Sequence, residues 1–513
     1  MSRPNQRWSV FDQWFPLGGL LLLAGCAEPP ASEVADLPAS YPVGWTADAV
    51  DEETNYEGTL EAQSGGWIDD FDDPQLRELV NEAIAQNYDL QATAASIGII
   101  SADATIAGAD QYPIVNADGD AARQKQNIGG SNTEFTTFMI GIGATWEIDV
   151  WGRLRDRQSA ALADVQAQLA TLQGARLSLA ARTANAWFRA IEAQQQLELA
   201  ESTYLSFDSA TSAIQERYER GVSPALDLRL SLAQTASAKA AVDQRGRDFD
   251  SSVRELEVLL GRYPSRELGI TPNLPVLVRP VPVGLPSELL ERRPDLVVAE
   301  RQLAASGKRV SEARKAMLPR ISLTGSYGYS SDELANMLSN SFSVWSIAGN
   351  ALQPIFQGLR LSAGVDRARA VAQQSLANYG QTALDAFREV ESALAAERFL
   401  DQRVINLDES ATQSIAAEDA AWERYQRGLS DIITVLESQR RAFESRTALI
   451  SARTNRLVNR VNLYLALGGD FGESEPNETE VDTPFGPKPI ALPEKVALQS
   501  KANDIKNSES DEI

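Results

Sequence analysis

The stretch RYQRGLSDIITVLE, residues 424–437, has a close copy elsewhere in the same chain, RYERGVSPALDLRL at residues 217–230. The glycines of the two copies, Gly221 and Gly428, are 207 positions apart. Such a glycine can adopt the positive φ that ends a helix, so each copy indicates a corner between two helices. Because the same corner sequence occurs twice, about two hundred residues apart, we infer a duplicated structural unit.

Other turn residues repeat at almost the same offset. Trp151-Gly152 corresponds to Gln357-Gly358 with a shift of 206. We therefore predict two related halves, residues 67–262 and 285–468, joined by a proline-rich linker at 263–284, because proline suits an extended connector. Chance similarity between helices rich in alanine and leucine is the alternative explanation.

The composition excludes several classes of function. The chain has 513 residues, 43% of them hydrophobic, and a formal charge of −24, which argues against nucleic acid as a partner. It has no histidine, and so lacks the commonest general base, the usual catalytic triads and histidine metal ligands. The acidic pairs Asp69-Asp70 and Asp72-Asp73 are expected to be solvated in a loop. We predict no enzyme activity and no cofactor.

The single cysteine follows a short apolar run. The N-terminus reads MSRPNQRWSVFDQWFPLGGLLLLAGC, with an apolar stretch too short to span a bilayer, which is typical of a targeting segment at residues 1–25. Leu23-Ala24-Gly25-Cys26 resembles a bacterial lipobox, in which a diacylglycerol is attached to the cysteine and the chain is cut before it. Residues 26–66 would then form an acylated polar tether, and Ala27, which is not Asp, favours sorting to the outer membrane. The alternative is a buried cysteine after an ordinary signal peptide.

Beyond Cys26 no apolar run approaches twenty residues, but alternating segments occur at matching places in the two halves. Period-2 alternation is typical of barrel strands between lipid and water. The four segments are VNADGDAA (115–122), FTTFMIGIGATWEIDVW (135–151), ISLTGSYGYS (321–330) and SFSVWSIAGNALQPIF (341–356).

Polar loops at residues 129–134 and 330–341 separate the segments into two hairpins. Four strands cannot close a membrane barrel, which needs about eight or more. We predict a trimer with twelve strands; a soluble hairpin packed on helices is the alternative.

Two long stretches without proline follow the strand hairpins, from Arg153 to about Glu219 and from Leu359 to about Arg427. Good helix formers dominate both, and each would be about 100 Å long as a helix. Each meets one of the glycine corners, after which a returning helix begins near Asp227 or Asp431. An ordinary coiled-coil rod is the alternative, but it does not explain the strand hairpins.

This order of elements resembles the TolC-like outer membrane factors, and most of all the lipidated branch that serves resistance-nodulation-division (RND) pumps. The resemblance covers about residues 60–468. It is carried by Cys26, GGWIDDFDDPQLRELVNEAIAQNYDLQAT (65–93), WEIDVWGRLR (146–155), both glycine corners and, most specifically, LPSELLERRPDLVVAERQL (285–303).

The resemblance implies an α+β membrane protein with an internal tandem duplication. Three chains would form a twelve-stranded outer-membrane barrel continuous with a long periplasmic helical barrel. A periplasmic adaptor would dock on the helical tips and connect the channel to an inner-membrane RND pump.

The resemblance also implies roles for residues of the two corners. Gly221, Gly428 and Asp431 would form tips that contact the adaptor. The acidic constriction of the family falls on Glu437 and on Thr434, a hydroxyl where TolC has an acid.

Asp227 matches an acid that holds the gate shut. The cationic partner of that acid would fall at Ser430, so the latch is either missing or uses Arg427 or Arg424.

The implied function is passive: an exit duct of a tripartite efflux system, anchored through Cys26 in the outer membrane of a Gram-negative bacterium. An acidic lumen would favour cations. A non-conducting coiled-coil lipoprotein scaffold is the alternative. The acidic, polar tail at residues 469–513 has the composition of a disordered segment.

Overall fold

The computed structural model describes residues 66–277, 292–336 and 338–469. The predicted signal peptide, Cys26, most of the tether, part of the linker and nearly all of the tail lie outside the described residues. The first half contains the elements η2 (Trp67–Phe71), α1 (Pro74–Gln86), α2 (Tyr88–Ala109), β1 (Ile114–Ile128), β2 (Ser131–Ile148), α3 (Arg153–Glu219) and α4 (Ala225–Leu259).

The described part of the second half begins with one helix and then repeats the order of the first half: two strands followed by a long and a shorter helix. It contains α6 (Pro294–Lys315), β3 (Arg320–Ser331), η3 (Leu334–Asn336), η4 (Asn340–Phe342), β4 (Ser343–Leu352), α7 (Arg360–Gln426) and α8 (Ile432–Ala466). The helices α3 and α7 both have 67 residues, and α4 and α8 both have 35. The two halves therefore place their helix corners at the same distance from the sheet.

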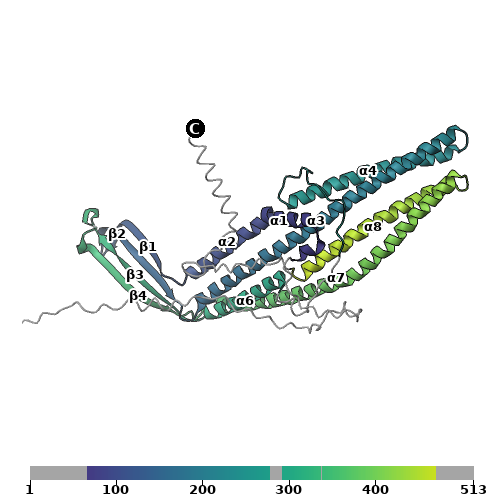
Figure 1. Cartoon of the computed structure of the whole chain (residues 1–513). Helices are drawn as coiled ribbons and strands as arrows, with labels where there is room; N and C mark the ends of the chain where they lie inside the picture. The colour runs from purple at the N-terminus through teal and green to yellow at the C-terminus, as the bar shows by residue number, and fades with distance from the viewer. Residues whose placement is uncertain (1–65, 278–291, 337, 470–513) are drawn as a thin grey trace, which may run out of the picture.

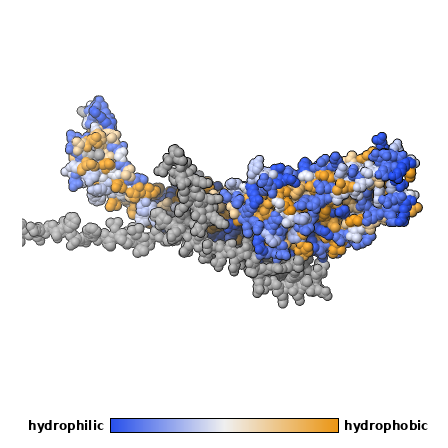
Figure 2. Space-filling view, turned by 45° about the horizontal axis from the view of Figure 1, so that its top comes forward, coloured by the Kyte–Doolittle hydropathy of each residue, from blue (hydrophilic) through white to orange (hydrophobic). Residues whose placement is uncertain are grey.

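The molecule is elongated, with the sheet at one end and both helix corners at the other (Figure 1). The pairs α3/α4 and α7/α8 form two long antiparallel hairpins that run side by side, and α1, α2 and α6 cover the part nearer the sheet. Figure 2 shows a mainly hydrophilic surface at the corner end, whereas apolar residues gather on the sheet below its hydrophilic outer end.

The four strands form one antiparallel sheet in the order β1-β2-β3-β4. Residues directly opposite each other in such a sheet lie on the same face. Tyr327 is opposite both Ile142 and Trp345, and Ile142 is also opposite Ala117, so the predicted apolar sides do share one face. The other face carries polar pairs such as Ser322 with Glu147.

The first predicted loop is wrong in extent. Only Gly129 and Gly130, with φ of 63° and 89°, separate β1 from β2, and most of 129–134 belongs to strand. Two consecutive residues at positive φ make a tight hairpin turn that glycine permits without strain. The predicted fourth strand ends at Leu352, before Pro354, which cannot donate to a sheet hydrogen bond.

Within the described chain the sheet is incomplete. Its outer strands β1 and β4 each pair on one side only, and every residue of β4 is exposed. A row of unpaired backbone groups on each edge is a template for another strand.

The main core lies where the helices of both halves meet. Its largest fully buried side chains include Trp187, Phe188 and Phe71, and Tyr464 packs beside them. Trp187 donates its indole N–H to Asp73 Oδ2 at 2.7 Å, which fixes the η2–α1 segment to α3.

The four acids of that segment are predicted to be solvated; Asp72 is exposed, but the prediction is wrong for Asp69, Asp70 and Asp73. Asp73 accepts hydrogen bonds from two backbone amides at the start of α1, Asp69 pairs with Arg77 at 2.5 Å, and Asp70 accepts a hydrogen bond from Tyr464. Burial, together with the Asp70 carboxylate, raises the pKa of Tyr464 above its ordinary value. Asp73 thus caps α1, Asp70 and Asp73 accept hydrogen bonds from core aromatics, and Asp69 forms an ion pair.

Arg293, in the sequence that most specifically carries the family resemblance, is buried and forms a junction between helices. Arg293 binds Asp295 through two nitrogens at 3.0 and 2.7 Å, Glu389 of α7 at 2.9 Å and the carbonyl of Ala466 in α8 at 3.0 Å. One guanidinium thus ties three helices together, while the neighbouring Arg292 is exposed.

By length and hydropathy one described helix, α2, could cross a membrane. The sequence had indicated no such run. Its alanines and isoleucines raise the mean hydropathy although polar residues interrupt it, and it packs against α3 through a face that includes Leu90, Ile97 and Ala104.

Replacing Arg293 with Ala should destabilise the junction, because charge-assisted hydrogen bonds contribute about 1.5–3 kcal/mol each. We expect the midpoint of thermal unfolding, measured by circular dichroism, to fall well below that of Arg292→Ala, the matched exposed control. Equal midpoints for the two variants would contradict the structural role of Arg293.

Replacing Gly328 with Ala should distort the sheet. The added Cβ would lie 2.7 Å from Gly141 Cα and against the Ile140 carbonyl oxygen on the next strand, so the backbone must shift. Overpacking of this kind costs about 1–3 kcal/mol.

At the control position Gly325 the nearest atom to an added Cβ is 3.8 Å away, an ordinary contact. Denaturant unfolding followed by circular dichroism should separate Gly328→Ala from Gly325→Ala. If Gly325→Ala lost more unfolding free energy than Gly328→Ala, the close contact with the neighbouring strand would not explain the destabilisation.

Candidate functional site

The two helix corners, here called the first tip (residues 217–227) and the second tip (residues 424–437), lie together at the end farthest from the sheet (Figure 1). At the first tip Gly221 has φ 73°, its N–H donates to the Tyr218 carbonyl at 2.8 Å, and the N–H of Val222 donates to the Arg217 carbonyl at 2.8 Å. At the second tip Gly428 has φ 72° and the same pair of bonds recurs. This pattern is the Schellman motif, and it explains why both copies require glycine.

The returning helices begin differently. Asp431 caps α8, accepting from the Thr434 N–H at 2.8 Å and from its hydroxyl at 2.7 Å. These hydrogen bonds, the hydroxyl's first, hold the pKa of Asp431 below its ordinary value. The helix α4 starts after Pro224 with no side-chain cap. The predicted residues Asp431 and Thr434 are therefore brought together as a helix cap.

The tips contact each other through Arg217 and Tyr425. The guanidinium carbon of Arg217 lies 5.2 Å from the centre of the Tyr425 ring, within cation–π range, and its Nη1 donates to the Gln426 carbonyl at 3.3 Å. The tyrosine is 5% exposed. It packs with Ile214 and Val435 in a small apolar cluster that joins α3 to α7 and α8.

The hydroxyl of Tyr425 faces the predicted gate acid. It lies 3.5 Å from Asp227 Oδ2 and 3.5 Å from the Ser223 hydroxyl, both on the first tip. Sequence reasoning selected Asp227 but missed Tyr425 and Arg217. The available signal was the repeated Arg-Tyr dipeptide before each glycine.

Neither of the two arginines considered as latch partners, Arg427 and Arg424, bonds to Asp227 within the described chain. Arg427 pairs with Glu423 one turn earlier on its own helix. Arg424 is exposed and makes no side-chain hydrogen bond or ion pair with described residues, and no bond from Ser430 to Asp227 is present there either. Within one chain the acid meets a phenol instead of a cation.

Glu437 lies one turn beyond Thr434 and is paired with two arginines. It accepts from Arg440 at 2.8 and 3.0 Å and from Arg441 at 2.7 Å. These hydrogen bonds lower the pKa of Glu437 to about 2, Arg440 contributing first. Arg440 also binds Glu444 at 2.5 Å, so two acids face two cations. The two arginines were not selected from the sequence, although their i+3 and i+4 spacing signals such pairs.

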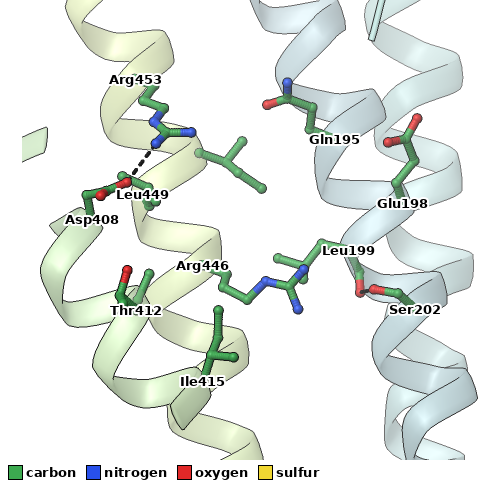
Figure 3. A pocket seen from close by; sticks show the side chains of 12 residues that line it. Gln195, Glu198, Leu199, Ser202, Asp408, Thr412, Ile415, Arg446, Leu449 and Arg453 are labelled. Carbon is green, nitrogen blue, oxygen red and sulfur yellow. Dashed lines mark hydrogen bonds and ion pairs between the residues drawn. The ribbon is translucent and has the colours of Figure 1, made fainter. Parts of the chain in front are cut away.

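Between the core and the tips the two hairpins diverge. An open groove of about 570 Å³ lies between α3 on one side and α7 and α8 on the other (Figure 3). Arg446 extends across it towards Leu199, and Arg453 is bound to Asp408 at 2.7 Å on the far wall. The two hairpins are therefore separated by the groove but contact each other again at the tips, through the apolar cluster around Tyr425.

No cluster of three or more metal-binding side chains occurs among the described residues. Cys26, the predicted lipidation site, lies outside them.

The chain matches the family model of the outer membrane efflux protein in two stretches, residues 79–262 and 285–469. It is 31% identical to outer membrane protein OprJ of Pseudomonas aeruginosa over 462 residues, covering 89% of this chain and 94% of OprJ. It is 28% identical to the cation efflux system protein CusC of Escherichia coli, covering 88% and 97%.

A solved structure of the outer-membrane channel OprN superposes with a TM-score of 0.79 at 27% identity, covering 87% of this chain and all of that one. The four-stranded sheet, the long helical hairpins and their order are thus those of solved outer-membrane channels. The chain belongs to the outer membrane efflux protein family and is an outer-membrane channel component of an efflux system.

Proposed function

We propose that three copies of this chain form a passive exit duct that is gated at the helical tips. The observation that carries the proposal is the pairing of an unclosed sheet at one end with two contacting tips at the other. The duct consumes no energy itself and has no cofactor, since transport is driven by a partner pump.

The sheet supports the trimer. Each chain brings four strands with both edges unpaired, and in lipid every backbone polar group needs a partner. Joining β4 of one copy to β1 of the next pairs all edges and gives twelve strands. The apolar face then meets lipid, and the face with Glu147 and Ser322 lines the lumen.

The helical hairpins support the tunnel and its partners. Three copies bring six hairpins of equal length, each about 100 Å along α3 or α7. Their tips, with Gly221, Gly428 and Asp431, are the surface offered to a periplasmic adaptor and, through it, to an inner-membrane RND-type pump.

We also propose the organisation of the remaining chain. Residues 1–25 are a lipoprotein signal peptide, and Cys26 is acylated and anchored in the outer membrane. Residues 26–66 are the tether. Two duplicated units, 67–262 and 285–468, flank the linker 263–284, and 469–513 form an acidic tail.

The gate consists of two layers at the second tip. In the first, Tyr425 holds Asp227 and Arg217 of the first tip, which keeps the hairpins of one protomer together. In the second, Glu437 projects near Thr434 on α8. Because Arg440 and Arg441 compensate Glu437, this ring favours cations less than an uncompensated acidic ring would.

The competing function is a non-conducting scaffold in the envelope. It predicts a monomer or dimer and no current across a planar bilayer. A trimer with discrete conductance steps contradicts it.

Tyr425→Phe removes one hydroxyl from the contact between tips. A hydrogen bond of about 1 kcal/mol corresponds to about a fivefold change in the equilibrium between closed and open tips. We expect the acylated protein in planar bilayers to open more often by about this factor, and Asp227→Ala to do the same.

Tyr263→Phe is the matched control, because this tyrosine is 84% exposed and is the first residue of the linker, far from the tips. If Tyr425→Phe, Asp227→Ala and Tyr263→Phe all opened equally often, the gate would not depend on the contact between Tyr425 and Asp227.

Glu437→Gln should lower cation selectivity, because Arg440 and Arg441 then lose their shared carboxylate. The lowered pKa also sets the pH dependence. A carboxylate with a depressed pKa keeps its ion pairs as the pH falls through its ordinary pKa of about 4.5, and loses them only near its folded pKa of about 2.

The difference in reversal potential between wild type and Glu437→Gln should therefore persist at about pH 3.5. Substituting both arginines with Ala should restore an ordinary titration of Glu437. A difference that vanishes near pH 4.5 in the wild type would show that the ion pairs do not form in the channel.

A further inference from the structure

Each tip carries an Arg-Tyr dipeptide, and the first tip uses its arginine for the contact between the tips whereas the second tip uses its tyrosine. At the first tip Arg217 contacts the other hairpin while Tyr218 is 43% exposed. At the second tip Tyr425 is buried while Arg424 is exposed. The contact between the tips therefore uses Arg217 and Tyr425. The other members of the two pairs, Tyr218 and Arg424, are called the leftover pair below.

The leftover pair has no partner among the described residues. Neither Arg424 nor Tyr218 makes a side-chain hydrogen bond, ion pair or ring contact there. The other tip arginines are occupied. Arg220 binds Glu216 at 3.2 Å and Arg427 binds Glu423, in the same i,i+4 arrangement at both tips.

At an offset of 207 the leftover residues match the pair already in contact. Arg424 corresponds to Arg217, and Tyr218 to Tyr425. In a closed ring of six tips, first and second tips alternate. Each second tip must therefore meet the first tip of the next copy, in the arrangement in which the two tips of one chain already meet.

We propose that Arg424 of each chain packs over Tyr218 of the partner subunit and so forms the seam between protomers at the tips. This inference rests on the proposed trimer. It assigns an exposed cation and an exposed aromatic ring, which nothing within one chain explains, to a contact with a second copy of this chain.

The seam is chemically weaker than the contact within a chain. Ser430 occupies the place of Ser223, but Thr434 occupies the place of Asp227. The phenol of Tyr425 thus faces a carboxylate, whereas the equivalent phenol at the seam faces a hydroxyl. Charge-assisted hydrogen bonds are about twice as strong as neutral ones, so the ring opens between protomers before it opens within them.

Cross-linking tests the seam directly. The variant Arg424→Cys/Tyr218→Cys is made in the full-length protein and treated in native membranes with a short bifunctional thiol reagent. We expect covalent trimers on a denaturing gel. Each single variant, which retains Cys26, should run as a monomer and thereby controls for the chain's own cysteine.

A parallel sample treated with a lysine-reactive cross-linker separates the two ways to fail. Lysine-linked trimers without thiol-linked products would overturn the seam and leave the duct intact. No trimer with either reagent would overturn both proposals.

A second readout compares Arg424→Ala with Arg220→Ala in planar bilayers. The first should raise the opening frequency several-fold and the second, an exposed tip arginine paired on its own helix, should leave it unchanged. Equal frequencies in both variants would contradict the role of Arg424.

Discussion

The backbone hydrogen-bonding groups along the outer edges of β1 and β4 set the architecture of this protein. Four strands leave two edges open, and a lipid environment supplies nothing to satisfy them. The only remedy available to an antiparallel sheet of this size is more strands from further copies. When three copies close the sheet, their helical hairpins must also form a ring at the end away from the sheet, and each copy contributes two hairpins to it.

Duplication makes that ring nearly sixfold, and in the proposed gate small departures from the repeat distinguish the contact within a chain from the contact between chains. The glycine corners, the i,i+4 pairs at the tips and the lengths of the long helices are the same in both halves. The departures are concentrated at a few side chains: Asp227 against Thr434, and Pro224 against Asp431. A contact inside one chain and a contact between chains can therefore share a geometry and differ in strength, which gives the ring a preferred place to open.

Much of this could be predicted from the sequence, for identifiable reasons. Helix boundaries near Arg153 and Glu219 follow from glycine corners and the absence of proline, which are local signals. The sharing of faces in the sheet follows from period-2 alternation in ISLTGSYGYS and its counterparts. These predictions needed no knowledge of distant contacts.

What could not be predicted depends on partners far apart in the chain. Asp70 and Asp73 of WIDDFDD were expected in solvent because nothing local shows that Tyr464 of α8 and Trp187 of α3 donate hydrogen bonds to them. Glu437 was predicted as an acidic ring, and Arg440 and Arg441 were overlooked although they lie within one turn. Asp227 was predicted as a gate acid without its phenol partner, since Tyr425 is 198 positions away in the chain.

The equal lengths of α3 and α7, and of α4 and α8, make the helical end a molecular ruler. One extra residue in α3 alone would raise the first tip by 1.5 Å and turn it by about 100°, taking Arg217 off the ring of Tyr425. The same insertion in α7 would do so from the other side. A single-residue insertion in one of the four long helices should therefore separate the tips, whereas substitutions that keep the helix lengths should leave the tips in contact.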